Sequence, residues 1–209
     1  CGYVRGAIDF GGNSINGGSA RIALLVKLGS DGSHIWSKSF GNTPEAMLQS
    51  VAVDAAGNVV VAGFFMDTVN LGAGVLTAAM PGPQGFVASY DSAGTYVYAR
   101  TWPVSGLINA VAIEASGNAL AVGTVNGPIA PGTGATGSAQ GALILELAPD
   151  GQLLNTRFTG STEPQGGFAA AAGKDGTAFF GGQFGASMSL DAFTLTSVGN
   201  TDAFVVRIR

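Results

Sequence analysis

One stretch decides the fold: Val51-Ala-Val-Asp-Ala-Ala-Gly-Asn-Val-Val-Val-Ala-Gly63, which returns as Val111-Ala-Ile-Glu-Ala-Ser-Gly-Asn-Ala-Leu-Ala-Val-Gly123. A weaker copy is Ala171-Ala-Gly-Lys-Asp-Gly-Thr-Ala-Phe-Phe-Gly-Gly182. Each copy has two short apolar runs on either side of a turn that contains Gly, which is the pattern of a β-hairpin. Because the hairpin recurs at intervals of about 60 residues, we interpret the chain as a tandem repeat.

A second repeated block lies between the copies of the first. It reads Leu24-Leu-Val-Lys-Leu-Gly-Ser-Asp-Gly32, Phe86-Val-Ala-Ser-Tyr-Asp-Ser-Ala-Gly94 and Leu143-Ile-Leu-Glu-Leu-Ala-Pro-Asp-Gly151, and a last copy begins at Phe204. In the second unit the two blocks predict four strands, at about 48–54, 59–65, 85–91 and 95–102. We therefore divide the chain into units of about 1–47, 48–106, 107–167 and 168–209, of which the first and last are partial.

The composition agrees with a folded all-β chain. Gly supplies 34 of the 209 residues and charged residues 11 % of them, against usual values of ~7 % and ~25 %. Gly recurs at the predicted hairpin turns, where it adopts a positive φ without steric cost. The stretch 43–50, with Pro44 in a first helical position, predicts at most a turn of helix. All-β is the predicted fold class.

The order of these segments resembles a known family. The stretch 50–64, followed by 85–94 and an aromatic strand, is similar to the bacterial SBBP-type repeats of β-propellers. The stretches 34–41 and 201–207 resemble the fourth and third strands of that repeat, whereas 173–176 departs from its turn. The resemblance implies a β-propeller built from about 60-residue four-stranded blades, with about three and a half blades present. It also implies an extracellular or cell-envelope protein of bacteria, and it assigns no catalytic residues.

The number of blades leaves three arrangements open. Closed propellers have typically 4 to 8 blades, each of them a four-stranded sheet. The chain is therefore a piece of a larger ring, a ring completed by several copies, or an open stack of sheets. We favour the piece of a larger ring, because both ends of the sequence fall inside repeat units.

Charge and hydropathy exclude several classes of partner. The net charge is −4 and the pI is about 4.7, and no cluster of Lys and Arg exists, so we expect no nucleic-acid partner. The longest apolar run, 59–66, is far shorter than the ~18 residues that a membrane span requires. Cys1 is either the lipidated first residue of a lipoprotein or a strand residue at the edge of a fragment. The repeat favours the second interpretation, because it places Cys1 in register with Ala62.

Few residues suggest chemistry. His34 is the single histidine, and a His-based metal site or a Ser-His-Asp triad is therefore not expected. Six of the 13 acids stand at equivalent turns, where each is predicted to accept a backbone N–H group: Asp31, Asp54, Asp91, Glu114, Asp150 and Asp175. Asp9 and Asn70 lie in Gly-rich loops that offer oxygen ligands for Ca²⁺, but too few acids gather there, and Asx turns are the better interpretation. We expect no metal and no cofactor.

These observations favour a non-catalytic extracellular β-propeller scaffold or adhesion and binding module of a bacterial surface or secreted protein. Its partner would be a protein or a polysaccharide, and the incomplete end units would permit self-association. Two alternatives stay open: a propeller-type lyase or glycoside hydrolase acting on an extracellular polymer, and a self-assembling structural protein. The residues predicted to contact a ligand are Asp9, Asp67, Asn70, Gln84 and Asp202, and the enzyme would use the three acids among them.

Overall fold

The computed structural model describes residues 1–41, 44–128, 138–161, 163, 165–173, 175–190 and 193–208. These residues form eighteen strands and contain no helix, so the predicted all-β class is confirmed. None of the described residues belongs to a helix long and apolar enough to cross a membrane.

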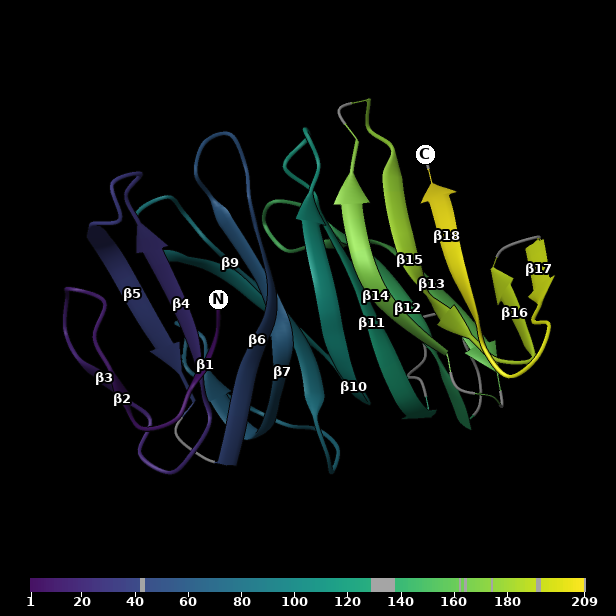
Figure 1. Ribbon diagram of the computed structural model, residues 1–209, viewed down its shortest axis with the longest axis horizontal. Helices are drawn as coiled ribbons and strands as arrows, with labels where there is room; N and C mark the ends of the chain where they lie inside the picture. The colour runs from purple at the N-terminus through teal and green to yellow at the C-terminus, as the bar shows by residue number, and fades with distance from the viewer. Residues whose placement is uncertain are drawn as a thin grey trace.

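Two three-stranded antiparallel sheets lie at the two ends of the molecule (Figure 1). Sheet 1 has the order β1-β4-β5 and consists of β1 (Gly2–Val4), β4 (Ile22–Leu28) and β5 (His34–Phe40). Sheet 4 has the order β14-β15-β18 and consists of β14 (Gln165–Ala172), β15 (Ala178–Phe184) and β18 (Asp202–Ile208). Sheet 1 thus corresponds to the last three strands of the first, partial unit. Sheet 4 corresponds to the first three strands of the last, partial unit.

Between them, the long strand β10 (Tyr96–Ile113) joins two four-stranded halves into one sheet. Sheet 2 contains β6 (Pro44–Val53), β7 (Val59–Asn70), β9 (Gln84–Tyr90) and the start of β10, with the short β8 (Val75–Thr77) paired to β7. Sheet 3 contains the end of β10, β11 (Ala119–Pro128), β12 (Ser138–Leu147) and β13 (Leu153–Ser161). The expected division at residue 106 therefore falls inside a continuous strand.

The turn of helix expected within 43–50 is wrong for 44–50, and Thr43 lies outside the described residues. Strand β6 pairs with β7, with Ala46 opposite Phe65 and Leu48 opposite Gly63. The alternate residues Ala46 and Leu48 are 1 % and 3 % exposed, which is the period of a strand. Cross-strand pairing and burial override the local helix signal of Pro44.

Sheets 1 to 4 stack face to face in chain order, and an apolar core fills each of the three gaps (Figure 1). We call the side of each sheet that is turned toward the next sheet its forward face. Leu25 of sheet 1, Val87 of sheet 2 and Ile144 of sheet 3 occupy equivalent forward positions, and each is less than 5 % exposed. Sheets 2 and 3 are thus buried on both faces, which leaves few positions for charged side chains.

A recurring glycine faces a β-bulge in the first pair of strands of each of the last three units. The bulges follow the residues opposite Gly63, Gly123 and Gly182. A Cβ atom on Gly123 would collide with the carbonyl oxygen of Leu107, and the other two glycines face equivalent carbonyl groups. The fixed glycine of the repeat is therefore required by the close approach of the neighbouring strand.

Six hairpin turns share one hydrogen-bond pattern. In each, the first residue donates its N–H to the carbonyl of the fifth, and a glycine at the fourth position, with a positive φ, donates to the carbonyl of the first. Five acids accept backbone N–H groups as predicted: Asp31, Asp54, Asp91, Asp150 and Asp175. Glu114 differs, because its carboxylate accepts the hydroxyl of Ser116, and that hydroxyl in turn accepts the N–H of Asn118.

We predict a loss of stability when Gly123 is replaced by Ala. The added methyl group presses on the carbonyl of Leu107, so the free energy of unfolding, measured by urea denaturation, should fall by about 2 kcal/mol. Gly2 has the same repeat position, but no atom lies within 4 Å of a Cβ built there. Gly2→Ala is therefore expected to change that free energy by less than about 0.5 kcal/mol. Equal losses in both variants would contradict the role given to the bulge.

The turn acids predict a pH dependence of stability. Hydrogen bonds from Ser33 to Asp31, from Thr95 to Asp91 and from Thr177 to Asp175 lower the pKa of each carboxyl below 3.8. A pKa that is lower in the folded state gives stability that is complete above the unfolded pKa and is lost as the pH falls through the folded pKa. The urea midpoint should therefore stay level from about pH 7 to 5 and decrease below about pH 4.

Asp91→Asn provides the check on this prediction. The variant should have a lower urea midpoint than the parent at pH 7 and a shallower decline in acid, because a neutral amide does not titrate there. An identical acid decline in the parent and the variant would mean that Asp91 makes no pH-dependent contribution.

Candidate functional site

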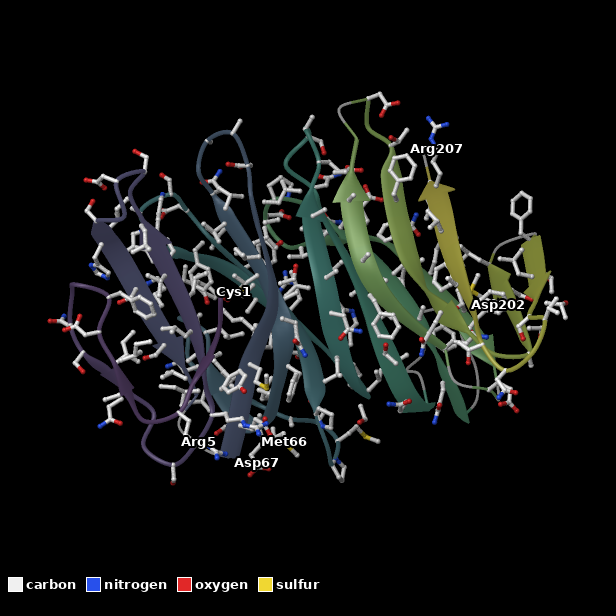
Figure 2. The ribbon with its side chains drawn as sticks, in the orientation of Figure 1. Cys1, Arg5, Met66, Asp67, Asp202 and Arg207 are labelled. Atoms are coloured by element: carbon white, nitrogen blue, oxygen red, sulfur yellow. The ribbon has the colours of Figure 1, made fainter. Side chains whose placement is uncertain are left out.

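The five residues predicted to contact a ligand are distributed over three parts of the molecule. Asp9 follows the short β2 (Ala7–Ile8) of the first unit, sheet 2 carries Asp67, Asn70 and Gln84, and Asp202 opens β18 of sheet 4. Figure 2 shows Asp67 and Asp202 well separated along the long axis of the molecule. The three acids of the enzymatic alternative are therefore not brought together. Among the described residues, no group of three or more His, Cys, Asp or Glu side chains could hold a metal ion.

Asp9 and Asn70 form the Asx turns expected of them. Asp9 Oδ1 accepts the N–H of Gly11 at 2.8 Å, and Asn70 Oδ1 accepts that of Gly72 at 2.9 Å. Each side chain thus shapes a loop of its own unit. Such a turn leaves the amide Nδ2 group of Asn70 as a further hydrogen-bond donor.

Gln84 and Asp202 also hold loops. Gln84 is 3 % exposed, and its Oε1 atom accepts the N–H of Ala79 at 2.6 Å. Asp202 Oδ2 accepts the N–H of Val198 at 2.8 Å. Both side chains are therefore bonded to the connection that precedes their strand.

Asp67 lies where β7 stops pairing with β6 and begins the side hairpin with β8. Its φ is +61°, in the left-handed region, and its carbonyl accepts the N–H of Ala78. Gly6 and Ala186 have the same position and positive φ in the first and last units. They open the hairpins of β2 with β3 (Ile15–Asn16) and of β16 (Ser187–Leu190) with β17 (Phe193–Thr196). The backbone geometry at Asp67 is thus shared between units, whereas its carboxylate is not.

Cys1 and His34 take no part in a shared site. Cys1 is a free and exposed cysteine, and Gly2 pairs with Leu24 as Gly63 pairs with Phe86. The register expected from the repeat is therefore present, while lipidation of Cys1 stays a prediction. His34 lies on strand β5 and is half-buried, with its ring against Gly12.

A groove between sheets 1 and 2 is the best candidate for a binding site. It has a volume of about 470 Å³, which is within the range of ligand sites. Lys38 and Phe40 of β5 form one wall, and Asn70, Tyr90 and Tyr96 of sheet 2 form the other. We call this site the aromatic groove.

Three aromatic rings contact one another in the walls of the aromatic groove. Phe40 and Tyr90 stack with their centroids 5.6 Å apart, and Tyr96 meets Tyr90 edge to face at 6.3 Å. Tyr90 is 1 % exposed, and its hydroxyl donates to the carbonyl of Leu71 at 2.8 Å. Burial raises the pKa of Tyr90 well above its usual value, so the phenol remains a neutral donor at physiological pH.

The rim of the aromatic groove carries one positive charge and polar groups. The Lys38 ammonium lies 5.7 Å from the centroid of the Tyr90 ring, a cation–π distance. Asn70 and Thr95 contribute an amide and a hydroxyl, and the lining contains no Asp or Glu. The groove therefore provides the partly exposed ring of Tyr96, hydrogen-bonding groups and one cation, whereas the rings of Phe40 and Tyr90 are buried. Its described lining does not include the pair of carboxylates that glycosidic hydrolysis uses.

Two basic residues at equivalent positions, Lys38 and Arg100, link neighbouring sheets. Arg100 of sheet 2 donates through Nε to the carbonyl of Gly151, in the turn of sheet 3, at 2.7 Å. Lys38 of sheet 1 occupies the equivalent position, and its side chain lies against Gly94 in the turn of sheet 2. Both basic side chains thus contact the following sheet.

A smaller cavity of about 170 Å³ lies between sheets 3 and 4. Its lining includes Glu114, Glu146 and Arg157 above an apolar base, and Glu146 accepts a hydrogen bond from Asn118. This volume is below the ~300 Å³ at which ligand pockets usually begin. The cavity therefore does not fit a polymer segment.

Tyr96 lines the aromatic groove but is not among the residues predicted from the sequence to contact a ligand. Alternation along a regular strand would place Tyr96 and Tyr98 on one face. The pairing of β10 with β9 shifts register between these two residues. Tyr98 consequently enters the core between sheets 2 and 3, while Tyr96 turns to the aromatic groove. No residue of the sequence marks this shift.

The comparisons with known proteins found little similarity. No family model and no curated protein matches the chain. A solved structure of a protein of unknown function from Bacteroides caccae is similar over 88 % of this chain and 72 % of its own, with 14 % identity and a TM-score of 0.31. This similarity is too weak to indicate the fold or the function.

We predict that Tyr90→Phe destabilises the wall of the aromatic groove. The variant loses the buried hydrogen bond to the carbonyl of Leu71, which is itself 1 % exposed. The free energy of unfolding from urea denaturation should fall by about 1 to 2 kcal/mol. Tyr3 is 47 % exposed, and the matched control Tyr3→Phe should stay within about 0.5 kcal/mol of the parent. A Tyr90→Phe variant as stable as the parent would rule out a structural role for this hydroxyl.

Proposed function

We propose that this chain is part of a non-catalytic β-propeller scaffold that binds a polysaccharide through the aromatic groove. The proposal rests above all on the lining of the groove, which combines the partly exposed ring of Tyr96, hydrogen-bonding groups and one cation, with no carboxylate among its described residues. Sugar rings offer an apolar face for stacking and hydroxyl groups for hydrogen bonds, and such a lining suits both. Lys38 favours a polymer that carries acidic groups.

The propeller is supported by three observations. The complete middle units each supply four antiparallel strands in sequential order. Consecutive sheets stack face to face through apolar contacts. The repeat resembles the SBBP-type blade, whose relatives are extracellular or envelope proteins of bacteria, and we propose that location for this chain. Sheets 1 and 4 lie at opposite ends of an open stack (Figure 1), and we propose that the stack is a piece of a larger ring.

Polysaccharide binding tests the proposal directly. The full chain is titrated calorimetrically with a panel of soluble acidic and neutral polysaccharides. Binding to at least one acidic polymer is expected, and Tyr96→Ala and Lys38→Ala should each raise its Kd by about tenfold or more, equivalent to about 1.4 kcal/mol. Tyr3→Ala is the matched control, because Tyr3 is an exposed tyrosine outside the groove, and it should leave the Kd unchanged.

Two results would overturn the proposal. One is the absence of any binding that depends on Tyr96 and Lys38 across the panel. The other is the release of shortened or unsaturated products from any polymer by the parent chain, since this would establish hydrolase or lyase activity.

A further inference from the structure

Asn70 forms its loop with only one end of its side-chain amide. Its Oδ1 atom accepts the N–H groups of Gly72 at 2.9 Å and Gly74 at 3.3 Å. No described residue accepts a hydrogen bond from its Nδ2 group, and the side chain is exposed in the lining of the aromatic groove. The nitrogen of a side-chain amide carries two N–H donors. Asn70 therefore brings two unused donors to one wall of the groove.

The repeat indicates that the fold does not need these donors. Asp9 has the equivalent position in the first unit and forms the same turn with a carboxylate, which accepts the N–H of Gly11 at 2.8 Å. Ser189 has this position in the last unit, where its hydroxyl is hydrogen-bonded to that of Thr194. In the described units, an amide occupies the position only beside the aromatic groove.

Lys38 brings further unused donors to the opposite wall. Its ammonium group lies 5.7 Å from the centroid of the Tyr90 ring, and within the described part of the chain no carboxylate or carbonyl accepts a hydrogen bond from it. Arg100, at the equivalent position of the next sheet, donates instead to the carbonyl of Gly151 at 2.7 Å. The ammonium of a lysine carries three N–H donors and no acceptor. Lys38 is thus available to a ligand in a way that Arg100 is not.

The other polar groups of the groove do not balance these donors. The hydroxyl of Thr95 is hydrogen-bonded to the carboxylate of Asp91, and the hydroxyl of Tyr90 donates to the carbonyl of Leu71. Ser39 adds a hydroxyl group, and the described lining contains no Asp or Glu. The groove therefore offers mainly N–H donors and a positive charge. Such a lining matches a ligand group that has several acceptor oxygens and a negative charge.

We propose that Asn70 and Lys38 together bind an oxyanion substituent of the polymer, a carboxylate or a sulfate group, and that Asn70 is a specificity-determining residue of the groove. This inference rests on the polysaccharide binding proposed above and adds the chemical group that the polymer must carry. An oxyanion accepts hydrogen bonds from an ammonium and an amide at the same time. The sugar ring that carries it would lie against the partly exposed ring of Tyr96.

Three glucans that share one backbone test the inference: dextran, carboxymethyl-dextran and dextran sulfate. Each is titrated calorimetrically into the full chain at the same ionic strength. We expect at least one of the charged glucans to bind about tenfold or more tightly than dextran. The charged glucan that binds more tightly identifies the oxyanion as a carboxylate or a sulfate.

Asn70→Asp is the decisive variant. It should keep the turn, because Asp9 forms the same turn in the first unit, so the urea midpoint should equal that of the parent. The substitution replaces the two N–H donors by a negative charge that repels an oxyanion. We therefore expect its Kd for the charged glucan to rise by more than about tenfold, and its Kd for dextran to stay unchanged.

Asn16→Asp is the matched control. Asn16 also accepts a glycine N–H, that of Gly18 at 2.8 Å, and it does not line the groove. This variant adds the same charge to the chain, and it should bind the charged glucan as the parent does. A loss of binding confined to Asn70→Asp would therefore exclude a general repulsion between the protein and the polymer.

Three results would overturn the inference. They are equal Kd values for the three glucans, an Asn70→Asp variant that binds the charged glucan as tightly as Asn16→Asp does, and a parent chain that binds neither charged glucan. None of these results by itself overturns the proposed function, which fails only if no polysaccharide of the wider panel binds through Tyr96 and Lys38 or if the chain cleaves one.

Discussion

Apolar contact between successive sheets is the interaction on which the rest of the structure depends. Sheet-on-sheet packing brings two backbones to about 10 Å, and the side chains between them must interdigitate. Sheets 2 and 3 make this contact on both faces, and all seven residues of β9 are buried. Few positions on these two sheets then remain for charged residues, which agrees with a charged fraction of 11 %. The bulge glycines answer a different constraint within each sheet, because the carbonyl group of the paired strand leaves no room for a Cβ.

The turns connect each sheet to the one before it. A Cβ on Gly94 would meet the ring of Trp36, and one on Gly151 would meet the ring of Tyr98. The turns at Gly94 and Gly151 therefore each lie on an aromatic ring of the sheet before. Trp36 reinforces the first contact by donating from Nε1 to the carbonyl of Ser92 at 3.3 Å. The rings of Trp36 and Tyr98 are thus used between sheets, whereas the register shift directs Tyr96 to the aromatic groove.

The sequence predicts the regular part of this structure well. The strands expected at 59–65 and 85–91 correspond to β7 and β9, because hydrophobic runs between Gly turns depend on local chemistry. Five of the six turn acids also accept backbone N–H groups as expected. Three features were not predicted: the continuous β10, the side hairpins and the aromatic groove. Each depends on contacts between units, and the shift at Tyr96 that forms the groove has no local signature.

The hairpins that branch from the second strands give the stack a direction. In sheet 2, Val69 at the end of β7 is 1 % exposed and packs toward sheet 1, and in sheet 4 Leu190 of β16 packs toward sheet 3. The hairpin of sheet 1 occupies the same side, where no described sheet precedes it, and it covers the apolar face there. The three side hairpins among the described residues lie on the side facing the previous sheet, and none of them covers a forward face. The forward faces of sheets 1, 2 and 3 are instead buried by the sheet that follows each of them.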